Sequence, residues 1–519
     1  MTQPIRPVAR LGLVVSAATA LALVGTGSAQ AGPAACDNRV NNTHAKLAEC
    51  VTLAGVQEHL AAFQSIADAN GGNRASGTTG FDASRDYVVS KLKAAGYSPQ
   101  VQDFTFRTFT ETAPTTLERV SPEPAGPIET NVMSYSGSGD VTADVTALPG
   151  PDVDETPGCE ASDFEGFTAG NIALISRGAC AFGLKAANAE AAGAAGVVIY
   201  NNADGVLNGT LGDDFTGEIP VTSVTKAVGQ ELAAVEGLVL SFTAQTVREE
   251  KTTYNITAET KGGDANHVVM VGAHLDSVPE GPGINDNGSG SASILEVAEG
   301  MAKVKPVNKV RFAWWGAEEA GLVGSYHYVD SLTEEQHAQI ALYLNFDMVG
   351  SPNPVNFIYD GDDSDDVGEG PGPEGSAQIE KAFESFYSSR GVPFKGTDFD
   401  GRSDYGPFIE TGIPSGGLFT GAEGIKTAEE AAIFGGQAGV AYDPCYHAAC
   451  DNLSNINTTA LDVNSDAIGY ATLQFAMNST SITGLPGKGN IREPVPAGAP
   501  AGVGGSQGGL HDDHELAAS

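Results

Sequence analysis

The sequence has few basic residues. It contains 27 Lys and Arg against 65 Asp and Glu, which gives the 519-residue chain a formal net charge of −38. Such a charge repels phosphate backbones and anionic lipids, so it argues against nucleic acid and membrane surfaces as partners. Beyond the N-terminus, no apolar run is long enough to cross a bilayer. We therefore expect a soluble mature chain, and we favour a monomer.

The N-terminus is the exception to this shortage of apolar runs. Arg6 and Arg10 precede an apolar stretch, 11–24, which gives way to small residues that end at Ala31. The stretch is shorter than the roughly 20 residues that a membrane anchor requires. Its Ala-Gln-Ala ending is typical of a processing site. We expect residues 1–31 to be a signal peptide that is removed from a secreted, extracellular protein.

Cysteine is also scarce, and no Cys-x-x-Cys motif is present, which weakens a redox or zinc-ribbon interpretation. An even number of cysteines in an exported chain favours disulfides. Proximity along the chain predicts three pairs: Cys36 with Cys50, Cys159 with Cys180, and Cys445 with Cys450.

The chain length and the change of texture along it indicate more than one domain. Helical patterns near the N-terminus give way, from about residue 120 to 244, to short β-like runs rich in Gly, Pro, Asp and Thr. After residue 266, apolar runs alternate with helical patterns, which is typical of an α/β domain. Past residue 482, Gly, Pro and Ala dominate, so we expect a flexible or processed tail in which a His-Asp-Asp-His-Glu cluster is not a functional metal site.

Each of three apolar runs in the α/β region ends in residues that suit a metal. His274 and Asp276 follow the first run, Glu318 and Glu319 the second, and Asp347 the third. Because the carboxyl ends of strands form the ligand crevice in open α/β sheets, these side chains can converge there. Alone, each acid would more often be a helix cap or a solvated loop residue than a ligand. Their convergence predicts a metal site.

Two further segments add candidate ligands. Asp286 lies in a Gly-rich loop that lacks the spacing of a P-loop or a dinucleotide fingerprint, so we interpret it as a metal bridge rather than a phosphate cradle or linker. His447 is either a packed histidine or a ligand. It lies between Cys445 and Cys450, whose disulfide would hold its loop rigid, and a rigid loop suits a ligand.

Five ordered motifs resemble the M28 family of zinc peptidases, especially its secreted bacterial aminopeptidases: Ala-His-Leu-Asp-Ser, Asn-Asp-Asn-Gly-Ser-Gly, Trp-Gly-Ala-Glu-Glu, Asn-Phe-Asp-Met-Val-Gly and Cys-Tyr-His-Ala-Ala-Cys-Asp. The resemblance covers about residues 56–113 and 254–478. It implies an α/β fold with a mixed central β-sheet flanked by helices. It also implies hydrolysis of the N-terminal peptide bond of peptides and proteins that have a free N-terminus.

The resemblance further implies two zinc ions bridged by Asp286. His274 and Asp347 would complete one zinc site, and Glu319 and His447 the other. Each zinc ion would then have three protein ligands and room for water. Imidazole and carboxylate ligands also accept cobalt or manganese.

Three residues are predicted to act beside the metal. Of the neighbours Glu318 and Glu319, the residues alone do not say which binds the metal, and the resemblance assigns Glu318 as the general base that takes a proton from the attacking water. Asp276, two positions after His274, would lie on the same side of a strand and accept the other ring N–H of that histidine. Tyr446 resembles the family tyrosine that stabilises the oxyanion, with a packed aromatic as the alternative.

The resemblance also suggests how a substrate is bound. Arg402 resembles a substrate-positioning arginine, although a surface salt bridge explains it nearly as well. Met348 and Phe419 match positions that line the pocket for the first side chain, and both are apolar. They imply a preference for large hydrophobic N-terminal residues, with core packing as the alternative.

Calcium is a doubtful further cofactor. Asp462 and Asp466 match half of a calcium site found in similar enzymes, but the stretch around Cys50 has no carboxylate where one is expected. The acidic loop 360–366 could bind calcium instead, although such charge runs are usually solvated.

The β-rich segment resembles a protease-associated (PA) domain over residues 133–247. We therefore expect a discontinuous peptidase domain, 32–132 and 248–481, with the tail at 482–519. Two alternatives to an aminopeptidase remain. One is another metal-dependent amidase of the same fold, such as a glutaminyl cyclase-like enzyme or a carboxypeptidase. The other is a non-catalytic peptide-binding scaffold.

Overall fold

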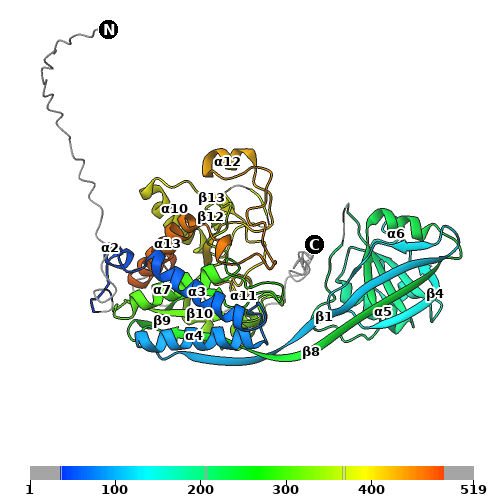
Figure 1. The fold of residues 1–519 in the computed structure, drawn as a ribbon, viewed down its shortest axis with the longest axis horizontal. Coiled ribbons are helices and arrows are strands. Elements are labelled where there is room, and N and C mark those ends of the chain that lie inside the picture. The colour runs from blue at the N-terminus through cyan, green and yellow to red at the C-terminus, as the bar shows by residue number, and fades with distance from the viewer. Residues whose placement is uncertain are drawn as a thin grey trace, which may run out of the picture.

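The computed structural model describes residues 36–483 except 37, 204, 206, 365 and 369. The expected signal peptide and all but the first two residues of the expected tail, including the His-Asp-Asp-His-Glu cluster, lie outside the described residues. The described chain forms two lobes that are joined by the long strands β1 (Gln100–Ser121) and β8 (Val239–Glu259) (Figure 1).

The larger lobe contains most of the helices. They are α2 (His44–Ala48), α3 (Leu53–Ala69), α4 (Thr79–Ala95), α7 (Gly288–Met301), α8 (Val323–Asp330), α9 (Glu334–Gln339), α10 (Ser376–Arg390), α11 (Gly406–Glu410), α12 (Ala428–Phe434), α13 (Thr458–Met477) and α14 (Thr480–Thr483), with the 3-10 helix η2 (Leu453–Asn455). Its strands are β9 (Asp264–His274), β10 (Asn308–Trp315), β11 (Ile340–Phe346), β12 (Phe357–Tyr359), β13 (Lys395–Thr397) and β14 (Ser415–Phe419). Threonine side chains cap the N-termini of α3 and α4.

The sheet of the larger lobe has the strand order β13-β12-β14-β11-β9-β10-β8. Strands β14, β11, β9 and β10 run parallel, whereas β8 is antiparallel to β10 and β12 to β14. The mixed sheet flanked by helices confirms the predicted fold class.

Alternate residues of β9 enter different cores, as the period of two in a strand requires. Val269 and Val271 pack with α3, α4, α7 and α13 on one face, and Met270 packs with α8 and α11 on the other. Covered on both faces, β11 and the C-terminal parts of β9 and β10 are almost entirely apolar.

The smaller lobe is the β-rich module that the sequence predicts. Its elements are β2 (Gly126–Ile128), β3 (Asn131–Val132), β4 (Gly139–Ala147), η1 (Ala161–Phe164), β5 (Ile172–Ser176), α5 (Phe182–Ala191), β6 (Gly196–Tyr200), β7 (Val221–Val224) and α6 (Lys226–Ala233). Every residue of β5 and β6 is buried, between a core that contains α5 side chains and a second core that contains Leu232 of α6.

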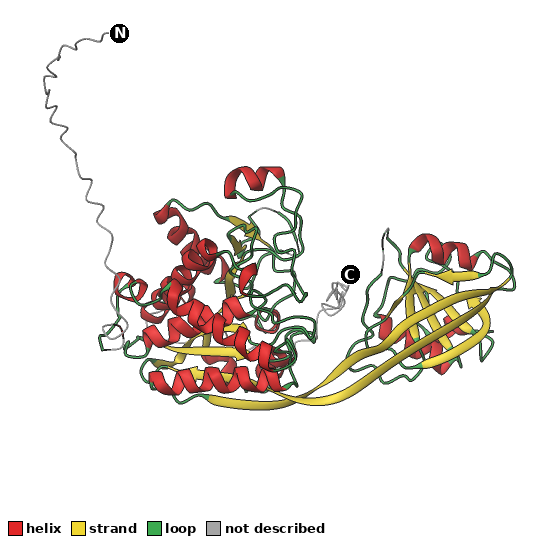
Figure 2. Cartoon of the chain, in the orientation of Figure 1, coloured by secondary structure: helices red, strands yellow, loops and turns green. Residues whose placement is uncertain are grey.

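Strands β1 and β8 connect the lobes as an antiparallel ribbon, which Figure 2 shows in yellow. Near its C-terminal end β8 pairs with β10, and near its start it pairs with β4, so it belongs to both lobes. The expected domain boundary between residues 247 and 248 therefore lies within one continuous strand.

Candidate metal centre

The predicted ligands come together because β9, β10 and β11 are parallel, so their carboxyl ends lie at one edge of the sheet. His274 is the last residue of β9, and Asp347 follows β11 directly. Glu318 and Glu319 lie in the turn that follows β10. The arrangement confirms that the strand ends bring these side chains together.

Asp286 lies between the two histidines and faces one with each carboxylate oxygen. Its Oδ1 is 3.2 Å from Nε2 of His274, and its Oδ2 is 3.3 Å from Nε2 of His447. Nε2 of His274 is also 3.3 Å from Oδ1 of Asp347, and Nε2 of His447 is 3.0 Å from Oε2 of Glu319. The five residues thus form two three-residue clusters that share Asp286.

The donor set fits a pair of divalent cations. Oδ1 of Asp347 and Oε1 of Glu319 are buried and have no hydrogen-bond partner among the described residues. Unsatisfied buried oxygens of this kind cost free energy unless a cation or a donor meets them. Two imidazoles and three carboxylates are ligands that zinc and similar metals accept.

Charge in the centre is strongly negative. Burial would lower the pKa of His447, but the carboxylates of Glu319 and Asp286 outweigh it and raise that pKa to about 11. Burial raises the pKa of Glu319 to about 7. Burial also raises the pKa of Glu318 well above its usual value, and the nearby Asp347 adds to that shift. The carboxylates therefore create a field that favours positive charge.

The loop of Asp286 is held from two sides. The side chain of Asp451 accepts hydrogen bonds from the backbone N–H groups of Asn285 and Asp286, at 2.8 and 3.0 Å. Asn287 caps helix α7 by accepting from the N–H of Gly290, and its amide donates to the carbonyl of Phe346 at the end of β11. These contacts fix Asp286 at the N-terminus of α7, where the helix dipole favours a carboxylate.

His447 lies in the loop closed by the disulfide between Cys445 and Cys450, as predicted. Its backbone has a φ of 52°, in the left-handed region that non-glycine residues rarely adopt. The other two predicted disulfides, Cys36–Cys50 and Cys159–Cys180, are also present.

Asp276 takes a position slightly different from the one expected. Strand β9 ends at His274, so Asp276 lies in the following loop rather than on the strand. Nδ1 of His274 is 3.2 Å from the main-chain oxygen of Asp276 and 3.6 Å from its carboxylate. The carboxylate instead accepts the backbone N–H of Glu318 at 3.3 Å, which links the ends of β9 and β10.

Tyr446 and Arg402 lie together at the same centre. The ring of Tyr446 stacks on His447 with centroids 3.8 Å apart, and Arg402 Nη2 donates to its hydroxyl at 3.2 Å. Arg402 also forms a 2.7 Å ion pair with Glu423. Arg402 thus forms a salt bridge and also lines the pocket beside Tyr446, and its role in positioning substrate stays a prediction.

A pocket of about 220 Å³ opens onto the metal centre. Met348 and Phe419, the expected specificity residues, line it, and so do Phe357 and Tyr442, which the sequence did not single out. Acidic residues also line the pocket: Asp398, Asp400 and Glu423. No residue of the smaller lobe is among the described lining residues.

Two supporting residues were missed by sequence reasoning. Ser403 Oγ donates to Oδ2 of Asp347 at 2.7 Å, and its only signal was its place beside Arg402. Arg74 is fully buried and donates to the carbonyls of Leu275, Pro282 and Gly283, so it holds the loop after β9 and the loop before Asp286. Burial lowers its pKa to about 10.

Asp462 and Asp466, the two residues that match half of a calcium site, belong to no cluster of three possible ligands among the described residues. Asp466 instead forms an ion pair with Arg390 at 2.6 Å. In the acidic loop, Asp360 and Asp362 approach Glu380 of α10. The carboxylate of Asp360 already accepts N–H and hydroxyl groups of its own loop.

Among the described residues, no helix is long and apolar enough to span a membrane.

The chain is similar in sequence and in structure to known aminopeptidases. Residues 255–472 match peptidase family M28, and residues 141–232 match the PA domain. The chain is 50% identical over 444 residues to an aminopeptidase of Pseudomonas aeruginosa, covering 83% of this chain and 82% of that protein. It is 44% identical to leucine aminopeptidase 2 of Arthroderma otae, covering 80% and 81% of the two chains. The solved structure of BSAP, a zinc aminopeptidase from Bacillus subtilis, is similar with a TM-score of 0.56 and 26% identity, covering 82% and 97%.

Proposed function

The chain belongs to peptidase family M28 and is an aminopeptidase, and we propose that it works with two zinc ions on peptides that begin with a large hydrophobic residue. The observation that carries this proposal is the position of Asp286, whose two oxygens face two separate imidazole–carboxylate sets. A carboxylate shared in this way is suited to bridge two cations.

We assign the ligands of the two ions from the two clusters that share Asp286; a third cluster, of His274, Glu318 and Glu319, does not contain this carboxylate. His274, Asp286 and Asp347 would hold one zinc ion, and Asp286, Glu319 and His447 the other. When bound, zinc would acidify water and polarise the scissile carbonyl group. Met348 and Phe419 would then contact the first side chain of the substrate.

Glu318 is the carboxylate that remains free to move protons. It is 4% exposed, and its Oε2 lies 3.8 Å from Nε2 of His274, farther away than the oxygens of Asp286 and Asp347. We assign it as the base that takes a proton from the attacking water and gives it to the leaving amine. The hydroxyl of Tyr446, which Arg402 holds in place, would donate to the carbonyl oxygen as negative charge develops there.

The pocket has an acidic part and an apolar part, and each would select a different feature of the substrate. The carboxylates around the centre favour a positively charged N-terminal amine, so a blocked N-terminus loses that attraction. Met348, Phe357 and Phe419 offer an apolar wall to the first side chain. The similarity to a leucine aminopeptidase supports the same preference.

A library of free-amine peptides and their N-acetylated copies, digested with and without a chelator, tests this function. We expect cleavage after the first residue of free-amine peptides only, with Leu, Met and Phe favoured over Gly and Asp. A chelator should abolish cleavage and added zinc should restore it. Cleavage of acetylated peptides would point to another amidase instead, and activity that survives complete metal removal would overturn the zinc assignment.

We also propose that the protein is secreted after removal of residues 1–31. The apolar stretch ending at Ala31 and the three disulfides support export, because disulfides persist in oxidising compartments. Amino-terminal sequencing of protein recovered from culture medium should begin at Gly32, whereas retention of the full chain in cells would contradict the proposal.

A further inference from the structure

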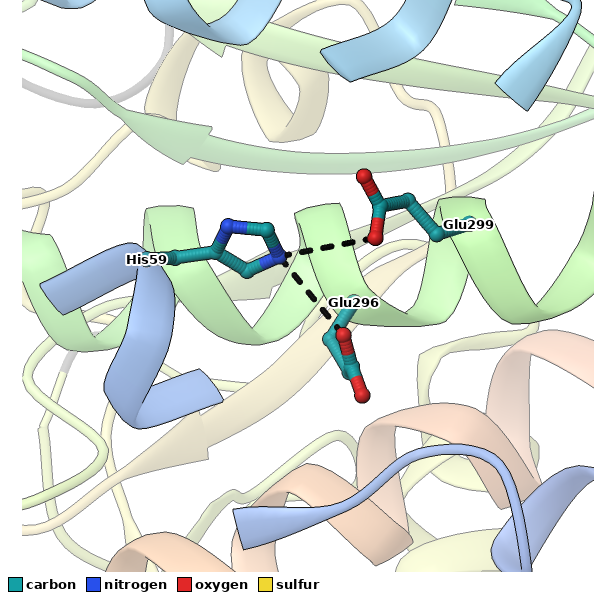
Figure 3. Close-up of side chains that lie close together, drawn as sticks. All are labelled: His59, Glu296 and Glu299. Atoms are coloured by element: carbon teal, nitrogen blue, oxygen red, sulfur yellow. Dashed lines mark ion pairs between the residues drawn. The ribbon is translucent and has the colours of Figure 1, made fainter. Parts of the chain in front are cut away.

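Three partly or fully buried side chains face one another between helices α3 and α7. His59 extends from α3, and Glu296 and Glu299 extend from α7 toward it (Figure 3). Nε2 of His59 is 3.6 Å from Oε2 of Glu296 and 3.9 Å from Oε2 of Glu299. None of the three residues lines the aminopeptidase pocket or belongs to the clusters around Asp286.

In each of these side chains, the second polar atom has a partner elsewhere. Nδ1 of His59 lies 2.8 Å from the hydroxyl of Tyr87 on α4. The Oε1 atom of Glu296 accepts from the backbone and the hydroxyl of Thr52, at 3.2 and 3.3 Å. The Oε1 atom of Glu299 lies 3.8 Å from Nζ of Lys91. The three remaining atoms, one nitrogen and two oxygens, point into the same space.

The ring of His59 gives a second, independent indication that a cation binds here. The residue is 1% exposed, and its Nε2 has no hydrogen-bond partner among the described residues. The two carboxylate oxygens are too distant for good hydrogen bonds. A buried ring nitrogen without a partner costs free energy, and a cation placed between the three atoms would remove that cost.

We propose that His59, Glu296 and Glu299 bind a divalent transition-metal ion of the zinc class at a site separate from the catalytic centre. One neutral imidazole and two carboxylates balance the charge of such an ion, and they are among its usual ligands. With bonds of about 2.1 Å, tetrahedral ligand atoms lie about 3.4 Å apart, close to the 3.6 and 3.9 Å between Nε2 of His59 and the two carboxylate oxygens. All three ligand atoms lie within 4.8 Å of one another. Water would complete the coordination.

The surroundings suit this role. When Nε2 binds the metal, Nδ1–H donates to Tyr87, and a ligand histidine is commonly oriented by such a hydrogen bond. Nζ of Lys91 forms an ion pair with Glu58 at 3.0 Å, closer than its 3.8 Å approach to Oε1 of Glu299. Gly55 makes room for the carboxylate of Glu296, because a side chain at this position would overlap it.

A metal ion at this site would link α3 to α7, the helix that begins just after Asp286. Helix α7 begins at Gly288, just after Asp286, and Glu296 lies about 12 Å farther along its axis. A metal ion here would therefore stabilise the position of α7 without touching the substrate. Its loss should change zinc content and stability more than turnover.

Zinc stoichiometry tests the site directly. Metal-free wild type, Glu296→Gln and Glu299→Gln would be dialysed to equilibrium against the same buffered zinc concentration, and zinc per chain measured by mass spectrometry. Asp68→Asn, an exposed change of the same charge on α3, is the matched control. We expect each Glu variant to bind one zinc ion fewer than wild type and Asp68→Asn to match wild type. Turnover of the zinc-loaded variants should stay within about twofold of wild type, as expected for a site remote from the chemistry.

Two outcomes overturn the proposal. Equal zinc content in wild type and both Glu variants would mean that the cluster is only a charged hydrogen-bonding group. Crystals of the zinc-loaded wild type provide the second test. If they show no anomalous zinc signal between His59 and Glu299, the cluster does not bind zinc. Should Glu296→Gln fail to fold, Glu299→Gln keeps the test intact, because its side chain is 29% exposed.

Discussion

At the scale of single residues, the neighbours Glu318 and Glu319 differ in how closely they approach the two histidines. Oε2 of Glu319 lies 3.0 Å from Nε2 of His447, whereas Oε2 of Glu318 lies 3.8 Å from Nε2 of His274. Glu318 also has its backbone N–H fixed by Asp276. These distances support our proposal that Glu319 binds metal and that Glu318 exchanges a proton.

Replacing Glu318 by Gln separates these tasks. The amide keeps the size of the side chain but cannot accept a proton, so kcat should fall by about 10²- to 10⁴-fold. Zinc content should remain at the wild-type value. Steady-state kinetics on an aminoacyl anilide and metal analysis of the same sample measure both.

Glu319→Gln is the matched control, because it makes the same chemical change one residue along the chain. It should lose zinc as well as activity. If Glu318→Gln instead loses zinc, or keeps its turnover, the two assignments are reversed or wrong.

At the residue scale, the sequence indicated which side chains come together at the ends of strands. His274 ends one apolar strand, and Glu318 and Asp347 follow two others, and strand ends are visible in a sequence. Their roles in catalysis and metal binding stay predictions. Ser403 and Arg74 act through contacts with residues far away in the chain, Asp347 and Leu275. No local pattern specifies such partners, so only the folded structure identifies them.

At the scale of elements, the loop of His447 depends on its disulfide. The loop between Cys445 and Cys450 spans a sequence separation of 5 and holds a ligand in a left-handed backbone conformation. Replacing both cysteines by Ser should cost about 2 kcal/mol of stability for so short a loop. Because the ligand would also lose its fixed position, we expect zinc affinity to fall by about tenfold or more.

Removing the Cys36–Cys50 disulfide is the control for that experiment. This bridge closes a longer segment at the N-terminal end of the described chain, and neither cysteine touches the pocket. Thermal unfolding should show a comparable loss of stability, with zinc binding unchanged. Equal zinc affinities in the two double variants would show that the Cys445–Cys450 bridge has no special role in holding His447.

Prediction at the element scale depended on how evenly a segment is buried. The apolar runs of β9, β10 and β11 were identified because both faces of these strands are covered. Strands β1 and β8, of 22 and 21 residues, have no buried residue over 107–116 and 245–252, where they pass from one lobe to the other. Their continuity is set by pairing with each other, which their composition does not encode.

At the scale of the whole molecule, the catalytic parts come from one lobe. The pocket lining contains no described residue of the smaller lobe. The connection between the lobes nevertheless passes close to the centre, because Phe104 and Phe106 of β1 pack with Ala317, the residue before Glu318. Whether the smaller lobe affects access or geometry can therefore be tested by removing it while keeping Phe104 and Phe106.

Excising the smaller lobe separates chemistry from access. Thr108 and Glu249 are paired across the ribbon, so an Asn-Gly turn between them can replace residues 109–248 and close β1 and β8 as a hairpin. Phe104 and Phe106 remain. We expect kcat/KM for a leucine anilide to stay within about threefold of the full chain, because every pocket residue is kept. A changed ratio between long peptides and the anilide would assign the lobe to substrate access. Loss of anilide hydrolysis in a variant that still unfolds cooperatively would instead show that the lobe maintains the catalytic geometry through β1.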